Sequence, residues 1–253
     1  MKRISAYIIS FFLLIAAALP GTAQDTVDVP LNIRVAAEIS GPVIYFIDKK
    51  TMNAEGNVFL DLNEKTSIMI GGGYSNYSYS QYNYDYRAKG IFFKTGADFN
   101  LMGVEKARGK YFAGVGFHYG ISMSSFEVPS FTTENYWGSV SSSIPLTSGT
   151  AHFLEVTPGV RTEVFKNFSM GWTINIRWLF YKGINKDLNP LYLPGFGNAG
   201  KNLSSGISYY ITFNIPYKKK RVIVMPPPPE EPDEDTLPDN QAQPGNTYSP
   251  FNP

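Results

Sequence analysis

The 253-residue chain contains no cysteine, and only 17% of its residues are charged, whereas about a quarter are charged in typical soluble domains. The absence of cysteine excludes both a disulfide framework and a lipid-modified cysteine anchor. Basic and acidic residues number 22 and 21, so no excess of positive charge favours nucleic acid as a partner. With 15% aromatic residues, this composition indicates a surface that partly contacts something other than water.

Long apolar runs are also missing, except at the N-terminus. Residues 1–23 have the organisation of a signal peptide: Lys2 and Arg3 precede an apolar run from Ile4 to Leu19, and small residues lead to Ala23. The run is shorter than the ~20 residues that a membrane-spanning helix needs. We expect cleavage after Ala23 and export, which leaves residues 24–30 as a short periplasmic segment.

Alternation of apolar and polar residues dominates residues 31–217. In the clearest case, between Phe168 and Tyr181, large apolar residues at even positions alternate with mostly polar residues at odd positions. This period of two predicts strands with two different faces. Eight segments show it, at residues 31–40, 57–63, 68–75, 91–101, 111–123, 154–164, 168–181 and 207–217.

Two architectures fit eight such strands. A soluble sandwich or lipocalin-like barrel points its apolar face inward, whereas an outer-membrane barrel points it at lipid. Glycines on the polar face favour the second, because a narrow barrel must pack that face into a small lumen; they are Gly71, Gly73, Gly96, Gly114, Gly116, Gly120, Gly159 and Gly171. We therefore predict an all-β fold, an eight-stranded antiparallel transmembrane β-barrel.

The polar face also carries charges of both signs in near balance. Isolated buried charges are costly, so we expect these side chains to form a hydrogen-bonded ion-pair network in the lumen. Its predicted members are Arg34, Glu38, Asp61, Lys94, Asp98, Glu155, Arg161, Glu163 and Arg177.

The connections alternate between short and long. Such barrels have short periplasmic turns and long extracellular loops, so the pattern predicts that both termini lie in the periplasm of a Gram-negative bacterium. Residues 218–253 follow the barrel as a basic segment and then an acidic, proline-rich tail. Its composition predicts disorder, and we expect either a tether for a periplasmic partner or a plain disordered end.

Two extracellular segments are candidates for binding other outer-membrane or surface proteins. The first long connection contains an apolar run with Ile44, Tyr45, Phe46 and Ile47, and exposed apolar patches mark contact sites. The second candidate is a tyrosine-rich stretch. We expect it to form a hairpin that turns at Ser80 and Gln81 and pairs Tyr79 with Tyr82 and Tyr77 with Tyr84. The aromatic face of this hairpin, with Tyr77, Tyr79, Tyr82, Tyr84 and Tyr86, would lean over the barrel mouth and either close it or offer itself to a partner.

The sequence offers only weak candidates for catalytic or metal-binding residues. His118 and His152 have no metal-ligand spacing, and no serine is placed convincingly beside His152 for nucleophilic catalysis. We therefore expect no enzymatic activity, no metal and no cofactor. Thr26 and Thr236 lie in Asp-Thr-apolar triplets that resemble an O-glycosylation acceptor motif of Bacteroidota, and both fall in segments predicted to be unfolded.

The stretches IRVAAEISGPVIYFIDKK, EVTPGVRTEVFKNFSMGWTINIRW and LYLPGFGNAGKN resemble a family of small outer-membrane barrel proteins from Bacteroidota, known mainly as a domain of unknown function. The resemblance implies an accessory role in outer-membrane biogenesis, in the barrel-assembly machinery. It covers most of the barrel but not the tail.

These observations predict a structural or accessory subunit of an envelope complex that acts through its loops and tail. Two alternatives remain open at this stage. One is an outer-membrane enzyme that modifies lipid, and the other is a narrow channel or a surface-binding barrel.

Overall fold

The computed structural model describes residues 26–183 and 190–223. The predicted signal peptide, Thr236 and most of the C-terminal tail lie outside these ranges. The elements are β1 (Thr26–Glu38), α2 (Ser40–Asp48), β2 (Thr51–Asp61), β3 (Thr66–Gln81), β4 (Tyr84–Asn100), α3 (Val104–Ala107), β5 (Tyr111–Asn135), β6 (Gly138–Phe165), β7 (Phe168–Gly183), β8 (Tyr192–Leu193), β9 (Gly197–Asn198) and β10 (Leu203–Ile223).

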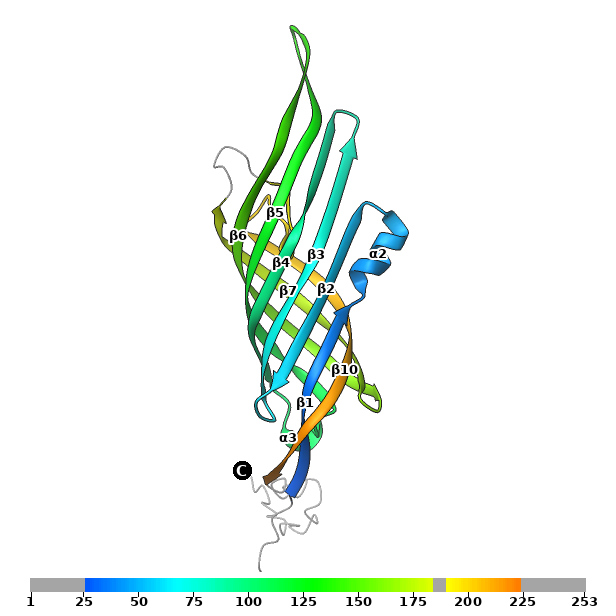
Figure 1. Ribbon diagram of the computed structural model, residues 1–253, viewed down its shortest axis with the longest axis vertical. Coiled ribbons are helices and arrows are strands. Elements are labelled where there is room, and N and C mark those ends of the chain that lie inside the picture. Colours follow the sequence, from blue (N-terminus) through cyan, green and yellow to red (C-terminus); the bar gives the residue numbers. More distant parts are fainter. Residues whose placement is uncertain (1–25, 184–189, 224–253) are drawn as a thin grey trace, which may run out of the picture. The chain divides into compact units, whose positions relative to one another are not determined.

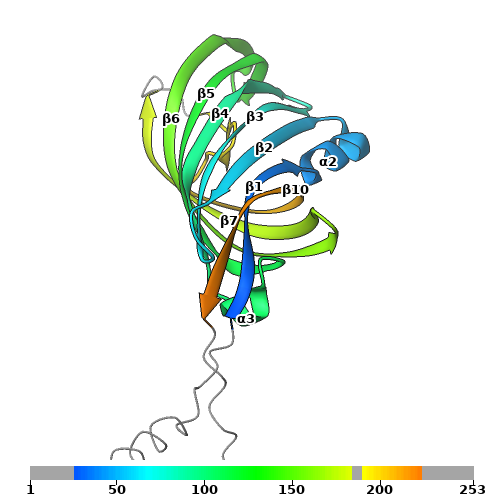
Figure 2. The same ribbon diagram turned by 60° about the horizontal axis from the view of Figure 1, so that its bottom comes forward.

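Eight of these strands close into an antiparallel barrel in the order β1-β10-β7-β6-β5-β4-β3-β2, which confirms the predicted fold class (Figure 1). Closure joins the first and last long strands, with Thr26 opposite Ile223 and Glu38 opposite Tyr210. Both ends of the described chain therefore lie at one end of the barrel, called here the termini end. The β3–β4 and β5–β6 turns lie at the opposite end, the hairpin end (Figure 2).

The predicted faces are present. On β7, Trp172, Ile174 and Trp178 point outward and are exposed, whereas Ser169 and Asn175 point inward and are buried. An apolar outer wall around a polar, glycine-rich interior is the arrangement of an outer-membrane β-barrel. Among the helices of the described residues, neither has the length and hydropathy to cross a bilayer.

The first and last strands, β1 and β10, are longer than the alternation predicted. β1 begins at Thr26 rather than Leu31, because residues 26–31 pair with residues 218–223 of β10. The basic segment after Tyr217 is thus part of a two-stranded extension below the barrel, and Thr26 lies in a strand rather than in an unfolded segment. The basic run of β10 does not alternate between apolar and polar residues, so the period of two does not extend over this pairing.

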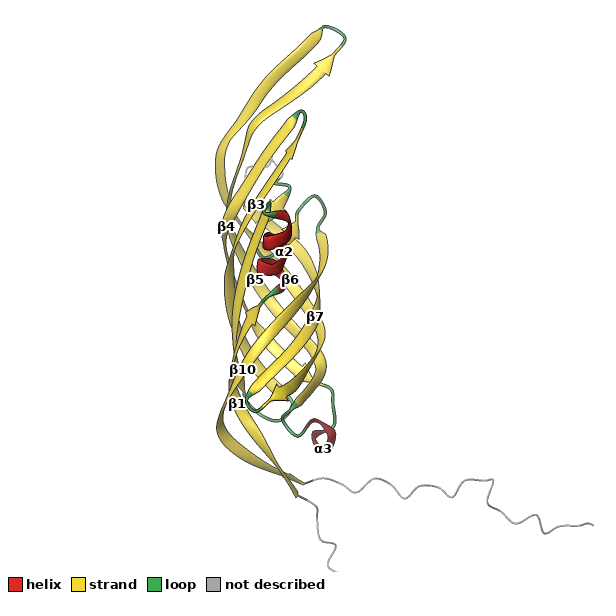
Figure 3. Cartoon of the chain, turned by 90° about the vertical axis from the view of Figure 1, so that its right-hand side faces the viewer, coloured by secondary structure: helices red, strands yellow, loops and turns green. Residues whose placement is uncertain are grey.

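Two of the predicted long loops are strand extensions. β3 and β4 continue to a turn at Tyr82 and Asn83, and β5 and β6 continue to a turn at Tyr136 and Trp137. Figure 3 shows both hairpins rising beyond the rest of the wall. The outward-facing residues change from apolar at Ile91 to basic at Lys89 in β4, which marks the edge of the apolar wall.

The tyrosine hairpin, which consists of the paired ends of β3 and β4, is present, but its predicted register was wrong. Tyr79 lies opposite Tyr86 and Tyr77 opposite Ala88, because the turn comes two residues later than expected. The segment 78–87 has no glycine at a turn position, so nothing in it fixed the position of the turn.

Candidate functional site in the plugged interior

The barrel interior contains an ion-pair network near the termini end. Arg34 on β1 lies 3.1 Å from Asp61 on β2. Ser67 on β3 accepts a hydrogen bond from Arg34 Nη2 at 2.8 Å and donates to Asp61 Oδ1 at 2.9 Å. The backbone N–H of Asn32 donates to the other carboxylate oxygen. Both charges are thus buried and paired, as buried ions must be.

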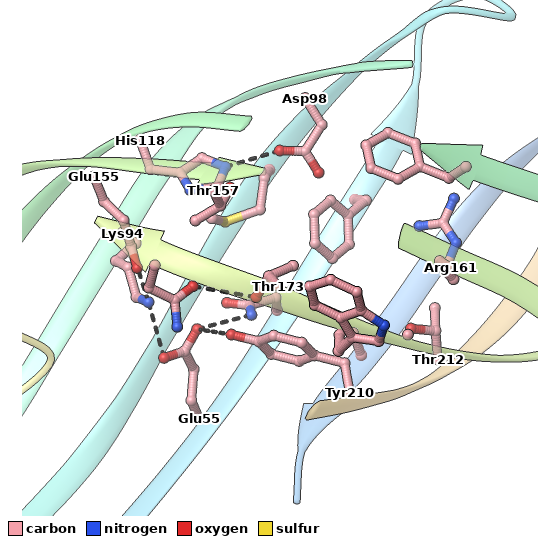
Figure 4. Close-up of a pocket in the computed structure, with 18 of the residues that line it drawn as sticks. Glu55, Lys94, Asp98, His118, Glu155, Thr157, Arg161, Thr173, Tyr210 and Thr212 are labelled. Atoms are coloured by element: carbon pink, nitrogen blue, oxygen red, sulfur yellow. Dashed lines mark hydrogen bonds and ion pairs between the residues drawn. The ribbon is translucent and has the colours of Figure 1, made fainter. Parts of the chain in front are cut away.

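A second cluster lies near the middle of the barrel (Figure 4). Lys94 Nζ lies 2.8 Å from Glu55 and 3.1 Å from Glu155. Arg177 Nε donates to Glu155 at 2.9 Å, and the Tyr210 hydroxyl donates to Glu55 at 2.9 Å. These contacts link five strands, and the side chains of Glu55, Lys94 and Glu155 are almost completely buried.

A third contact joins His118 Nε2 to Asp98 Oδ1 at 2.9 Å. Gly116 makes room for this pair, since a Cβ there would lie 2.3 Å from Asp98 Oδ1 and 2.7 Å from His118 Cε1. The glycine is therefore needed for packing inside the barrel, as its place on the polar face predicted.

Five of the nine predicted lumen residues enter ion pairs in the described residues, and Asp98 hydrogen-bonds to His118; the five are Arg34, Asp61, Lys94, Glu155 and Arg177. The other three do not pair as predicted. Arg161 stacks over the Phe112 ring at 5.1 Å. Glu163 accepts a long hydrogen bond from the Asn167 backbone at the β6–β7 turn. Glu38 accepts from the backbone N–H of Gly41.

Sequence reasoning missed Glu55, which is a central member of the network. The predicted second strand begins at residue 57, so Glu55 falls in the connection before it, although it has the same phase as Asn57 and Asp61 on β2. Extending the alternation of β2 by one further step would have found it.

A cavity of about 70 Å³ lies beside these clusters and is lined by Glu55, Lys94, His118, Arg161 and Tyr210 among others. Such a volume holds a few water-sized molecules. It does not resemble a continuous channel, since eight strands leave an interior that side chains fill.

An apolar plug closes the interior toward the hairpin end. Its buried members are Tyr86, Ala88, Phe126, Val128, Ala151, Phe153, Leu179, Leu193, Phe196 and Ala199. Phe153 covers Gly120, where an added Cβ would lie 2.2 Å from the ring. The segment 190–200, between β7 and β10, thus folds into the barrel mouth and places Phe196 inside it.

The tyrosine hairpin holds this segment in place. Tyr77 stacks on Tyr192 with ring centroids 4.6 Å apart. The Tyr86 hydroxyl accepts hydrogen bonds from the backbone N–H groups of Leu191 and Tyr192. Burial raises the pKa of the Tyr192 hydroxyl above its ordinary value, so this ring is neutral in the plug.

Four of the five hairpin tyrosines therefore point toward the plug, and the geometry favours closure of the mouth over an open aromatic surface. Tyr77, Tyr79 and Tyr84 pack against the plug, and Tyr86 belongs to it. Tyr82 lies at the turn and is fully exposed, because the shift in register moves it off the aromatic face.

The apolar run of the first connection forms α2, on the outside of the barrel beside β2 (Figures 1 and 3). Ile44, Tyr45, Phe46 and Ile47 are all exposed there, and Phe46 and Ile47 are 79% and 82% exposed. Only Gly41 of this helix is buried.

A model of the family described as "Domain of unknown function (DUF6048)" matches residues 2–220. The chain belongs to the DUF6048 family. No curated protein sequence matches this DUF6048 chain.

Several solved structures are similar to this DUF6048 chain, at 10–12% identity. The N-terminal β-barrel domain of Pseudomonas aeruginosa OprF is 10% identical, with 76% of this chain and 98% of that chain covered and a TM-score of 0.29. Acinetobacter baumannii CarO2 is 11% identical, with 74% and 99% covered and a TM-score of 0.38. Neisserial surface protein A is 12% identical, with 77% and 100% covered and a TM-score of 0.32.

The DUF6048 barrel does not assemble a nucleophile and base in its described residues. His118 bonds Asp98, and the Ser122 hydroxyl is buried with no hydrogen-bond partner in this part of the chain. His152 Nδ1 lies 2.5 Å from the Tyr119 hydroxyl on the outer wall, among the rings of Phe180 and Tyr181. No group of three potential metal ligands occurs among the residues that the structure describes.

Proposed function

We propose that this protein is a non-enzymatic outer-membrane barrel that acts as a structural or accessory subunit of an envelope complex. The observation that carries the proposal is the combination of a plugged lumen with two hairpins that extend beyond the apolar wall. A barrel whose interior is filled by ion pairs and aromatic rings has its accessible chemistry on its outer surfaces.

The β5–β6 hairpin is the main contact surface in this proposal. Its turn carries Tyr136 and Trp137, which are 93% and 90% exposed and pack edge to face at 5.2 Å. Aromatic residues are enriched at protein interfaces because they bury a large area with few rotatable bonds. The hairpin end faces outside the cell in this proposal, since long connections of such barrels are extracellular.

The partner is another outer-membrane or surface protein, and the C-terminal tail is a second contact in the periplasm. The resemblance to small barrels of Bacteroidota favours a complex that assembles outer-membrane proteins.

Photo-crosslinking in intact cells tests the proposal. A photoreactive residue at Tyr136 should give a discrete protein adduct that also co-purifies in mild detergent, and mass spectrometry of the adduct then tests the assembly role. A matched control is the same residue at Ile70, which lies on the lipid-facing wall of β3 and is 64% exposed. A protein that gives no adduct from Tyr136 and always elutes alone would contradict the proposal.

The two alternatives make different predictions. A lipid-modifying enzyme requires that deletion and His152→Ala change the lipid A profile in the same way. A narrow channel requires conductance in planar bilayers. The proposal expects an unchanged lipid profile and no conductance.

A further inference from the structure

The wall of the barrel is incomplete at the hairpin end between β2 and β10. β1 separates these strands only as far as Glu38, which lies opposite Tyr210 of β10. Beyond that point, residues 51–55 of β2 pair only with β3, and residues 203–209 of β10 pair only with β7. Within the described residues, no strand fills the space between them.

Helix α2 continues the chain across this space. The backbone N–H of Ile39 donates to the Tyr209 carbonyl at 2.9 Å, and the helix then runs along the outside of β2 (Figure 1). Gly41 approaches β2 so closely that a Cβ would lie 2.2 Å from the Asn53 carbonyl oxygen. Past this first turn, α2 covers the space with exposed side chains and little packing.

The exposed surface of α2 is apolar. Residues 42–47 are all apolar or aromatic, and a helix that is apolar on every side requires an apolar surrounding. The outer face of β10 at this level carries Ile207 and Tyr209, which belong to the lipid-facing wall. The helix surface is thus continuous with that wall.

A cavity of about 150 Å³ lies under α2 in the space between β2 and β10. Its lining changes from apolar at Ile44 and Ile207 to polar inside, at Asn175 and Ser208. Asn175 and Ser208 are 1% and 8% exposed and hydrogen-bond each other at 2.6 Å. Asn175 also lines the central cavity beside Lys94, so the space under α2 leads from the bilayer toward the ion-pair network.

Glu38 places a buried carboxyl group without a cationic partner among the described residues at this cavity. The nearby cations are already paired, Arg177 with Glu155, and Lys94 with both Glu55 and Glu155. Glu38 is 5% exposed and forms no ion pair in the described residues; its carboxylate accepts hydrogen bonds from the backbone N–H of Gly41 and from the Ser40 hydroxyl. A buried carboxylate without a cation favours a cationic ligand group.

We propose that the space between β2 and β10 is a lateral portal for an amphiphile with an ammonium head group. The head group binds Glu38 under α2, and its hydrocarbon chains remain in the bilayer beside Ile44 and Ile207. The portal site is separate from the hairpin contact surface and does not depend on it.

Native mass spectrometry of the full-length protein in lipid nanodiscs tests this site with phosphatidylethanolamine as the probe and phosphatidylglycerol as the anionic comparison. Wild-type protein should retain phosphatidylethanolamine at least tenfold better than phosphatidylglycerol. Glu38→Gln should abolish this preference, whereas the control Glu127→Gln, on the exposed hairpin, should keep it. Equal retention of both lipids by wild type, or an unchanged preference in Glu38→Gln, would overturn the proposal.

A second variant keeps Glu38 in place. Because the chain has no cysteine, the pair Ile44→Cys and Ile207→Cys can be crosslinked selectively to fix α2 on β10. Crosslinking before exposure to lipid should reduce uptake of phosphatidylethanolamine at least fivefold, and a reducible crosslinker should restore uptake on reduction. Unchanged uptake by the crosslinked protein would rule out entry through the portal.

Discussion

Tyr77 on β3 stacks face to face on Tyr192 of β8, with ring centroids 4.6 Å apart and an interplanar angle of 6°. The contact joins the tyrosine hairpin to the segment that fills the barrel mouth. Since Tyr86 on the neighbouring strand accepts two backbone hydrogen bonds from that same segment, closure of the lumen depends on a few side chains of one hairpin.

Tyr86→Phe should loosen the segment 190–200 without unfolding the barrel. The substitution keeps the buried ring but leaves the N–H groups of Leu191 and Tyr192 without their acceptor, at a cost of about 1–3 kcal/mol for a buried donor. Hydrogen exchange should show faster exchange of these two amides. Tyr82→Phe is the control, since Tyr82 is fully exposed at the turn. Equal protection in Tyr86→Phe and wild type would contradict this role of the hydroxyl.

Gly120→Leu should destabilise the barrel, because the new side chain would occupy the space of the Phe153 ring. Overpacking of a filled interior costs about 1–3 kcal/mol. Urea unfolding in detergent or lipid, followed by the gel-mobility shift between folded and unfolded barrel, measures the loss. Adding Phe153→Ala should recover part of it, and a double variant no more stable than Gly120→Leu would argue against a direct clash.

The alternation of side chains was sufficient to predict the barrel, because lipid on one side and a narrow lumen on the other impose a strict period of two. It also located most ion-pair residues, although not their partners, since Glu55 and Lys94 meet across the lumen from strands that are not neighbours. Such contacts depend on the tilt of the strands, and the period of two does not determine that tilt.

The connections were predicted less well for a different reason. Residues 42–47 have no polar residue to mark a face, so helix α2 had no periodic signal. The hairpin strands beyond the membrane lose their apolar outer face at Lys89 and Ser125, and with it the pattern that identified them as strands. These segments pair as strands because the β3–β4 and β5–β6 ladders of the barrel continue into them.

Lys94→Met should be among the most damaging single substitutions. It removes the cation between Glu55 and Glu155 and leaves two buried carboxylates close together, and breaking a buried pair costs about 3–5 kcal/mol. Lys89→Met, on the exposed face of the same strand, should change stability by less than ~0.5 kcal/mol. Adding Glu55→Gln to Lys94→Met should restore part of the loss in the same urea assay. A Lys94→Met barrel as stable as Lys89→Met would show that the cluster adds nothing to stability.

Single-cysteine labelling should establish the orientation, since the natural chain contains no cysteine to react. If the hairpins extend outside the cell, Tyr136→Cys should react with a membrane-impermeant maleimide on intact cells, because the β5–β6 turn is exposed beyond the apolar wall. Lys65→Cys, in the exposed β2–β3 turn at the termini end, should react only after the outer membrane is permeabilised. Ile70→Cys, on the lipid-facing wall, controls for reagent that enters the bilayer and should stay unlabelled in both conditions. Labelling of Lys65→Cys but not Tyr136→Cys on intact cells would reverse the orientation, and the hairpin contact surface would then lie in the periplasm.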